Sequence, residues 1–441
     1  MKPPLRKRCR AMPDVSPPPP LLHPVRKLRS EAPALEEVEG AVRKALAPLL
    51  ESRALPEGAP VAVTCGSRGI DRIAEVVGAA CAALREAGAR PFIVPAMGSH
   101  GNATAEGQRR VLAEYGVTEQ NVGTPVVSSL ETATLGCTAE RVEVFMDRAA
   151  WEAGRVLVVN RVKPHTTFDG QVESGLFKMM SVGLGKLDGA RSFHRHSMRL
   201  GFAPILLAMG RLALNSGRIW AGLGLVENDE HRLAEVAAAP AAGIEALERH
   251  LLVCARRLYS RLPFSDLELL IVDEMGKNIS GTGMDTKVIG RTPHPGLEPL
   301  RLEGATHVRR IYVRDLTPQS EGNATGVGFA DVIHRRLFEK IDLAATYTNG
   351  RAALSFNGMR VPMHFPTDRE AVEFLLGTLG SPEPGALRAV RIRNTLALSE
   401  FLATPACARQ LQGNENYECG PARALQFDES GALVQLATSN Y

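Results

Sequence analysis

The chain of 441 residues is longer than one hydrophobic core usually serves, so two domains are expected. Hydrophobic residues make up 44% and charged residues 23%, as in ordinary globular proteins, and no run of about 18 apolar residues exists that would form a membrane-spanning helix. The net charge of +4 is uneven: positions 1–30 hold eight basic residues and one acidic residue, which leaves −3 for the remainder and argues against general binding of nucleic acid.

Residues 1–30 form a basic segment rich in proline, with Pro17 to Pro20 in succession. This composition is typical of a disordered, polyproline-like tail, and the segment lacks the apolar centre of a signal peptide. The seven cysteines are scattered and none lies in a C-x-x-C pair. The sequence therefore predicts a cytoplasmic protein rather than a disulfide scaffold or a zinc ribbon.

The first predicted domain covers residues 31–262 and alternates short apolar runs with helical patterns. Its expected elements, in chain order, are a helix over 33–50, a strand at 61–64, a helix from Ile73 to Gly88, a strand at 92–95, a second helix, a strand at 155–160, and helices over 198–215 and 240–260. The βαβα order at its start predicts a parallel sheet with helices on its faces.

The second predicted domain, residues 263–441, begins after "SRLPFSD" interrupts the helical pattern near residue 262. Its expected elements are strands at 267–274, 309–315 and 387–395, and helices over 329–341 and 368–380. The expected fold class is therefore α/β, with two α/β domains whose mainly parallel sheets face an interdomain cleft. Clefts of this kind are where ligands usually bind.

Polar residues follow three strands of the first domain. The first strand runs into Arg68, the second into His100 and the third into His165. Because parallel sheets bind ligands just beyond the carboxyl ends of their strands, these side chains are expected to converge. Arg68 in "GSRGID" could equally cap a loop, and His165 alone is ambiguous. His100 lies in a glycine-flanked loop, "GSHGN", where function is favoured.

The stretch "GLFKMMSVGLGKLDGARSFHRH" places Lys178 between Phe177 and Met179. Its plainest interpretation is a lysine whose stem lies along apolar surface while its ammonium reaches water. The stretch ends in His194 and His196, which would share a face on an extended segment and diverge on a helix. Two histidines alone are a weak metal signal, and no P-loop, zinc-protease or nucleophile-elbow motif accompanies them.

Taken together, the strand-end arginine, "GSH", "PH" with a following Gly-rich lysine segment, and a downstream histidine resemble the lactate racemase family. These are 2-hydroxy acid racemases and epimerases that depend on a nickel pincer nucleotide, and the resemblance is best over residues 60–200. In that family the cofactor is a pyridinium bisthiocarboxylic acid mononucleotide, joined through a thioamide to a lysine. Two sulfurs, one ring carbon and a histidine bind the nickel.

The resemblance implies a role for each of five residues. Lys178 would carry the cofactor and His194 would bind nickel. His100 and His165 would act as acid and base, and Arg68 would bind the substrate carboxylate. The predicted partner is thus a small-molecule 2-hydroxy acid, with no nucleic acid and no membrane.

Two features depart from the family pattern. The segment "DGQVESGLFK" is longer than the usual "AGFSGGRK"-like run and lacks its double glycine. Cys65 and Gly66 stand where the family has aspartate and histidine, which suggests a substrate other than lactate. The implied chemistry is physically sound, because hydride transfer to a pyridinium avoids a carbanion that a 2-hydroxy acid cannot stabilise. Histidine titrates near neutrality and suits both proton steps.

Local sequence adds expectations about the same stretch. An amine among apolar residues has its charged form disfavoured, which would let Lys178 act as a nucleophile. Gly175, Gly183 and Gly185 are expected to let backbone approach the flat ring, and a turn through "LDGA" at 187–190 to return the downstream histidine to the metal.

Two other interpretations remain open. One is a zinc-dependent hydrolase or lyase with His165, His194 and His196 as ligands, and the other is a non-catalytic nucleotide-binding protein. Metal analysis would separate the three interpretations: bound nickel would support the racemase, bound zinc the hydrolase or lyase, and neither metal the nucleotide-binding protein.

The second domain offers weaker candidates. Lys277 or Lys287 could approach the cofactor phosphate or the substrate, and Tyr347 and Asn349 could make polar contacts. "GNATGVGFAD", residues 322–331, is expected to open a helix whose N-terminus could bind an anion.

Overall fold

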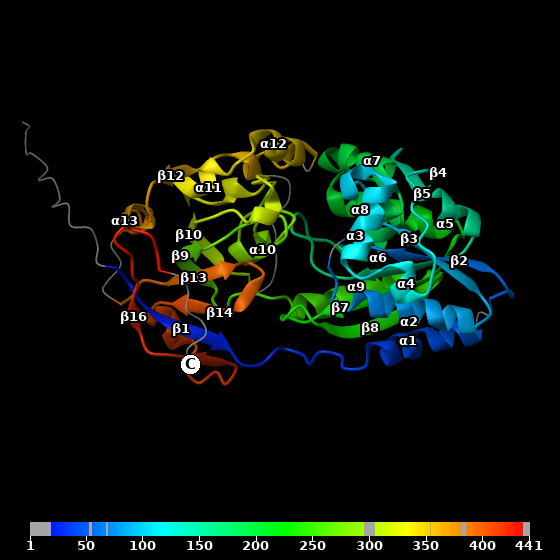
Figure 1. The fold of residues 1–441 in the computed structure, drawn as a ribbon, viewed down its shortest axis with the longest axis horizontal. Helices are drawn as coiled ribbons and strands as arrows, with labels where there is room; N and C mark the ends of the chain where they lie inside the picture. Colours follow the sequence, from blue (N-terminus) through cyan, green and yellow to red (C-terminus); the bar gives the residue numbers. More distant parts are fainter. Residues whose placement is uncertain are drawn as a thin grey trace, which may run out of the picture.

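The protein is described from a computed structural model that covers residues 19–52, 55–67, 69–294, 305–352, 354–380 and 385–434. It has two α/β lobes, each built around its own sheet (Figure 1). The first sheet is mainly parallel, and the second is mixed, with a parallel half from β12 to β13 and antiparallel pairings beyond it. The predicted α/β fold class is confirmed. The predicted boundary near residue 262 falls between the last helix of the first lobe and the first strand that follows it.

The first lobe contains a five-stranded sheet in the order β3-β2-β6-β7-β8. Its strands are β2 (Pro60–Cys65), β3 (Arg90–Pro95), β6 (Val156–Arg161), β7 (Ile219–Glu227) and β8 (Leu233–Pro240). The first four strands of that order are parallel, and β8 pairs antiparallel with β7 at the edge. After its first residue β2 is buried throughout, as expected for a strand covered on both faces.

Helices cover both faces of this sheet, and two apolar cores lie between them and the strands. The helices are α1 (Val38–Ser52), α2 (Ile73–Glu86), α3 (Ala105–Glu114), α4 (Glu119–Val122), α5 (Arg148–Ala153), α6 (Leu176–Lys178), α7 (Lys186–Leu200), α8 (Phe202–Asn215) and α9 (Ile244–Arg257). A hairpin of β4 (Thr132–Cys137) and β5 (Glu143–Asp147) and a π turn at Met179–Gly183 complete the lobe. The helix predicted over 198–215 is two helices, because Gly201 between them has a φ of 86°.

The second lobe has a nine-stranded sheet within the described residues, ordered β12-β11-β10-β9-β13-β14-β1-β15, with β16 paired to β1. Its strands are β1 (Leu21–Lys27), β9 (Asp266–Val272), β10 (His307–Val313), β11 (Val332–His334), β12 (Met363–Phe365), β13 (Ala389–Asn394), β14 (Ala397–Ala403), β15 (Tyr417–Cys419) and β16 (Arg423–Ala424). Its helices are α10 (Thr286–Ile289), α11 (Arg335–Glu339), α12 (Leu343–Ala352), α13 (Asp368–Gly377) and α14 (Pro405–Gln410). The helix predicted over 329–341 is wrong in its first half, which pairs with β10 as β11.

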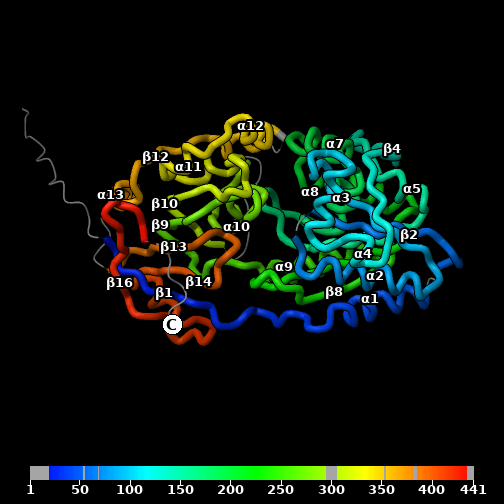
Figure 2. Tube along the Cα trace, in the orientation of Figure 1, coloured from blue at the N-terminus to red at the C-terminus, as the bar shows by residue number. Residues whose placement is uncertain are grey.

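The predicted disordered tail over residues 1–30 is wrong in its last part, because β1 is a strand of the second lobe. It pairs antiparallel with β14 and β15, and its Val25 is buried in the core of that lobe. Residues 1–18 lie outside the described residues. After β1 the chain crosses to α1 in the first lobe, as the blue trace in Figure 2 shows. Lys27 and Asp229 form an ion pair of 2.5 Å along this crossing.

The lobes also meet beside the loop that follows β6. Thr286 Oγ donates a hydrogen bond to Thr166 O, and Lys287 pairs with Asp169. These contacts bring α10 of the second lobe against the carboxyl end of the first sheet. Within the described ranges, none of the helices has both the length and the apolar character needed to cross a membrane.

Candidate active site

The loop that carries His165 is closed on itself after β6. Lys163 and Ser174 pair through two backbone hydrogen bonds of 2.8 and 3.2 Å. Glu173, which is fully buried, accepts a hydrogen bond of 2.6 Å from the backbone N–H of His165 and pairs with Arg256. The position of His165 is therefore fixed by a buried carboxylate.

His165 and Lys178 are in direct contact, with 2.8 Å between Nε2 and Nζ. The backbone N–H of Thr167 donates to Nδ1 of the same ring at 3.1 Å, and Nε2 faces Nζ of Lys178. Burial holds the pKa of His165 well below its ordinary value, and a charged Lys178 would lower that pKa further.

The backbone that carries Lys178 is held from behind by α9. Glu248 on α9 is fully buried, and its Oε2 accepts a hydrogen bond of 2.7 Å from Phe177 N–H. Burial raises the pKa of Glu248 to about 8. Asn160 at the end of β6 donates from Nδ2 to Gly175 O at 2.8 Å. Lys178 thus extends from a short helix that is anchored on both sides.

The glycines around Lys178 face protein, which corrects the expectation that they leave room for a flat ring. A Cβ added at Gly175 would lie 2.4 Å from Oε1 of Glu248. One at Gly183 would lie 2.6 Å from Ala96 O, and one at Gly185 would lie 2.8 Å from Ser181 O. These glycines let the turn pack closely against its own lobe.

His194 lies on α7, so residues 187–190 are helical and the predicted turn is wrong. Its Nδ1 is buried and has no hydrogen-bond partner among the described residues. Burial lowers the pKa of His194 to about 4, with smaller contributions from Lys178 and His294. His194 is therefore a neutral imidazole with a free buried nitrogen, close to the predicted attachment lysine.

His196 does not join His194. Two residues apart on a helix, their side chains diverge by about 200°. In the part of the chain that the structure describes, the one group of three possible metal ligands lies elsewhere, on β8 and α9. The structure thus does not bring His165, His194 and His196 together as a zinc site.

The loops after β2 and β3 meet at His100. This side chain is exposed, and its Nδ1 is hydrogen-bonded to Ser67 Oγ. The β2 loop also reaches the lysine segment, because a Cβ at Gly66 would lie 3.3 Å from Cε of Met179. Arg68, the predicted carboxylate-binding residue, lies outside the described residues.

Of the two candidate lysines of the second lobe, Lys287 lies near His165, whereas Lys277 bonds within its own loop. Lys287 is 2% exposed, pairs with Asp169 and lies near enough to His165 for its charge to lower the pKa of that ring. Lys277 donates from Nζ to Gly281 O at 2.5 Å.

For Tyr347, Asn349 and residues 322–331, the described part of the structure gives no contact with the candidate site. Tyr347 on α12 is 45% exposed, and Asn349 accepts a hydrogen bond of 3.2 Å from Asn323. Residues 322–331 do not open the expected helix, since they form a short 3-10 turn and run into β11.

A row of four rings connects the lobes beside the site. His165 stacks on Phe168 with 4.4 Å between ring centroids, Phe168 on Phe202 at 5.7 Å, and Phe202 on His294 at 5.2 Å. A pocket of about 280 Å³ opens next to this row. It is lined by Thr167, Ser197, Met198, Arg199, Leu200, Gly201, Phe202 and His294. The pocket thus lies where His294 of the second lobe meets the junction of α7 and α8, and Thr167 of the loop that carries His165 forms part of its wall.

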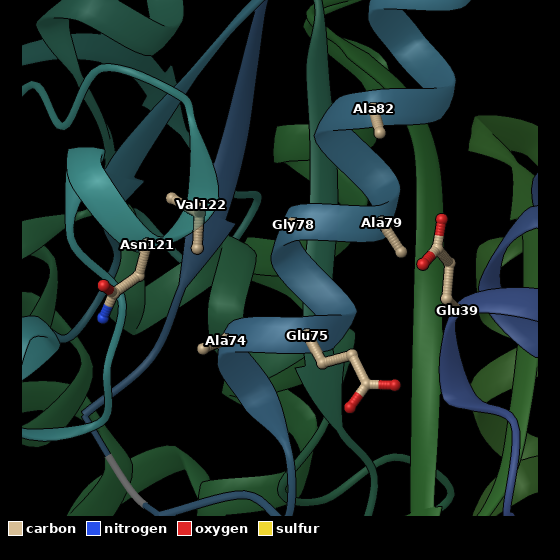
Figure 3. A pocket seen from close by; sticks show the side chains of 8 residues that line it. All are labelled: Glu39, Ala74, Glu75, Gly78, Ala79, Ala82, Asn121 and Val122. Carbon is tan, nitrogen blue, oxygen red and sulfur yellow. The ribbon is translucent and has the colours of Figure 1, made fainter.

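A larger pocket, of about 350 Å³, lies elsewhere (Figure 3). It runs along α2 between α1 and α4 and is lined by Glu39, Ala74, Glu75, Gly78, Ala79, Ala82, Asn121 and Val122. None of these side chains is a histidine, cysteine or lysine, and the pocket is on the helical face rather than at the strand ends. We therefore assign no chemistry to it.

Sequence reasoning missed three residues of the site: Glu173, Glu248 and His294. Glu173 lies within "DGQVESG", and the available signal was that it is one of two carboxylates, with Asp169, between His165 and Lys178. Glu248 and His294 are far away in the sequence and come to the site through the packing of α9 and of the second lobe.

The mainly parallel first sheet and the mixed second sheet, each covered by helices, define a two-lobed α/β protein. The loops after β2, β3 and β6 of the first sheet lie near Lys178 and His165. Among solved structures, this fold is shared with the lactate racemase apoprotein from Thermoanaerobacterium thermosaccharolyticum. That structure has a TM-score of 0.50 and 12% sequence identity, over 84% of this chain and 94% of the other.

A protein from Thermotoga maritima is similar with a TM-score of 0.46 and 14% identity, over 65% of this chain and 72% of the other. No family model and no curated protein matches the sequence. By its similarity to the lactate racemase apoprotein, the chain has a lactate racemase-like fold.

Proposed function

We propose that the protein is an isomerase, a racemase or epimerase of a 2-hydroxy acid, that works with a nickel pincer nucleotide. The observation that carries this proposal is the 2.8 Å contact between Nζ of Lys178 and Nε2 of His165. It supports the proposal because a histidine, a side chain suited to acid or base catalysis, lies against the atom to which the cofactor would be joined.

The described residues fit the group in two respects. Lys178 offers an amine whose Nζ lies 2.8 Å from Nε2 of His165, and an amine in its uncharged form attacks a carbonyl or thiocarbonyl carbon. His194 offers a neutral imidazole whose buried Nδ1 has no partner within the described ranges, as suits a nickel ligand. When bound, the group would supply a reversible acceptor for hydride.

The remaining chemistry falls to side chains of this chain. His165, as a neutral imidazole, would act as acid or base toward the hydroxyl of one enantiomer through Nε2, the ring atom that faces Lys178 and hence whatever is attached to it. His100 would do the same for the other enantiomer. Arg68 would bind the carboxylate through two parallel N–H donors. Lys163 and Lys287, whose charges act on His165, would favour an anionic substrate.

We also propose that the protein is cytoplasmic. All six described cysteines are free, which agrees with a reducing cytoplasm. The partner would be a small-molecule 2-hydroxy acid, and the pocket beside Phe202 and His294 would receive its side chain.

The test is to co-express the chain with the enzymes that make the cofactor. We expect the peptide that contains Lys178 to carry a mass adduct, the protein to contain nickel, and an enantiopure 2-hydroxy acid from a panel to racemise. Lys178→Ala should lose the adduct and the activity together, whereas Lys44→Ala, an exposed lysine on α1, should lose neither. Full activity in Lys178→Ala would remove this lysine from the mechanism.

A further inference from the structure

A second cluster of metal-binding side chains lies away from the candidate active site, on α9 and the edge strand β8. His250 and Cys254 are four residues apart on α9 and therefore lie on one face of the helix. Glu235 on β8 faces them, and one ligand atom from each of the three residues lies within 4.8 Å of the other two. Between Cys254 Sγ and His250 Nε2 the distance is 4.0 Å.

This geometry is close to that of a tetrahedral zinc site. Bonds of about 2.3 Å to sulfur and about 2.05 Å to nitrogen place the two ligand atoms about 3.6 Å apart at the tetrahedral angle. The observed 4.0 Å needs only a small rotation of the exposed His250 side chain. Thiolate, imidazole and carboxylate together form a donor set that suits Zn²⁺, and the exposed side of the cluster leaves a fourth position for water.

The electrostatics of the cluster also favour a cation. Cys254 is half-buried beside the Glu235 carboxylate. A thiolate beside a carboxylate is unfavourable unless a positive ion lies between them, and a divalent ion in contact with both would offset their repulsion.

We propose that Glu235, His250 and Cys254 bind one Zn²⁺ ion that fastens α9 to the edge strand β8. On binding, the thiol loses its proton, so that Zn²⁺ and Cys–SH give Cys–S–Zn⁺ and H⁺. The site is structural, because its three residues lie on α9 and β8 and none of them belongs to the candidate active site. Its consequence reaches that site indirectly, since α9 also carries Glu248, which holds the Lys178 backbone.

The experiment uses the full-length protein made without the cofactor pathway and freed of metal, with Co²⁺ as a spectroscopic substitute for Zn²⁺. We expect one equivalent of Co²⁺ to produce a thiolate-to-metal charge-transfer band, which Zn²⁺ then displaces. Calorimetry of Zn²⁺ binding in two buffers of different ionisation enthalpy should give release of one proton per ion.

Cys254→Ser should abolish the band and the proton release, and His250→Ala should shift the Co²⁺ titration to at least tenfold higher concentration. The matched control is Cys137→Ser, an exposed cysteine on β4, which should leave both signals unchanged. Circular dichroism confirms that each variant is folded. Absence of the band in the parent protein, or its survival in Cys254→Ser, would overturn the proposal.

Discussion

Replacing Glu248 with glutamine isolates the effect of a buried carboxyl on stability. Glu248 has an ordinary pKa of 4.5, which burial raises to about 8 in the folded protein. A carboxyl whose folded pKa is raised contributes stability that is complete below pH 4.5 and is lost as the pH rises through about 8. The loss is about 1.4 kcal/mol per pH unit, or about 5 kcal/mol across this window. Glutamine does not titrate and keeps an oxygen for the Phe177 N–H.

The parent protein should therefore lose unfolding free energy as the pH rises from 4.5 to 8, whereas Glu248→Gln should not. We expect the difference between variant and parent to shift in favour of Glu248→Gln by up to about 5 kcal/mol over this range. The measurement is urea unfolding at half-unit pH intervals, followed by tryptophan fluorescence. Both tryptophans, Trp151 and Trp220, lie in the first lobe, so the signal reports the lobe that contains Glu248.

The control is Glu245→Gln on the same helix. Hydrogen bonding to Arg211 lowers the pKa of Glu245, so its stabilising effect is lost only as the pH falls, and its difference from the parent should be constant above about pH 5. A difference between Glu248→Gln and the parent that is equally flat from pH 4.5 to 8 would show that Glu248 is charged in the folded state, and the reasoning would fail.

Three further predictions concern the site directly. His100→Ala and His165→Ala should each abolish racemisation in the cofactor-loaded enzyme while nickel content stays unchanged; loss of metal in His165→Ala with retention in His194→Ala would favour a different metal site. Arg68→Lys should raise KM and lower kcat for the preferred 2-hydroxy acid, because an ammonium cannot make two parallel hydrogen bonds to a carboxylate, and unchanged kinetics with every acid tested would eliminate that role. In Glu173→Gln, at least one buried donor would face the amide N–H₂ in place of a carboxylate oxygen. The unfolding free energy should therefore fall by about 1–3 kcal/mol, and turnover should fall with it. A variant as stable and as active as the parent would contradict the anchoring of His165.

Elements with a continuous apolar run or a clear helical period could be predicted from the sequence. β2 and α2 lie within a few residues of their predicted bounds, because burial on both faces or on one face sets their composition. β1 and β11 could not be predicted. β1 contains a proline and two basic residues, and β11 has three residues, so their extended form depends on partner strands far along the chain.

The residues of the site also fall into those that the sequence could indicate and those that it could not. His165 and Lys178 are only 13 positions apart, in the connection that follows β6, so their closeness could be expected from the sequence. His194 and His196 point in different directions because both lie on α7, and the Gly-rich sequence of this stretch does not predict a helix there. Glu248 holds the lysine segment only because α9 packs behind α6, and no local pattern contains that information.

The place of β1 in the second sheet also sets an order of events during synthesis. All strands of the first sheet lie between residues 60 and 240, so that lobe can be completed while the ribosome is still translating the second. β1 is made before either lobe, yet His23 bonds Gly420 O, 397 positions later. At about 5–20 residues per second, β1 waits tens of seconds for β14 and β15. The nascent chain therefore carries β1 without its partner strands throughout this time, and the backbone N–H and C=O groups of β1 stay unpaired until the second sheet forms.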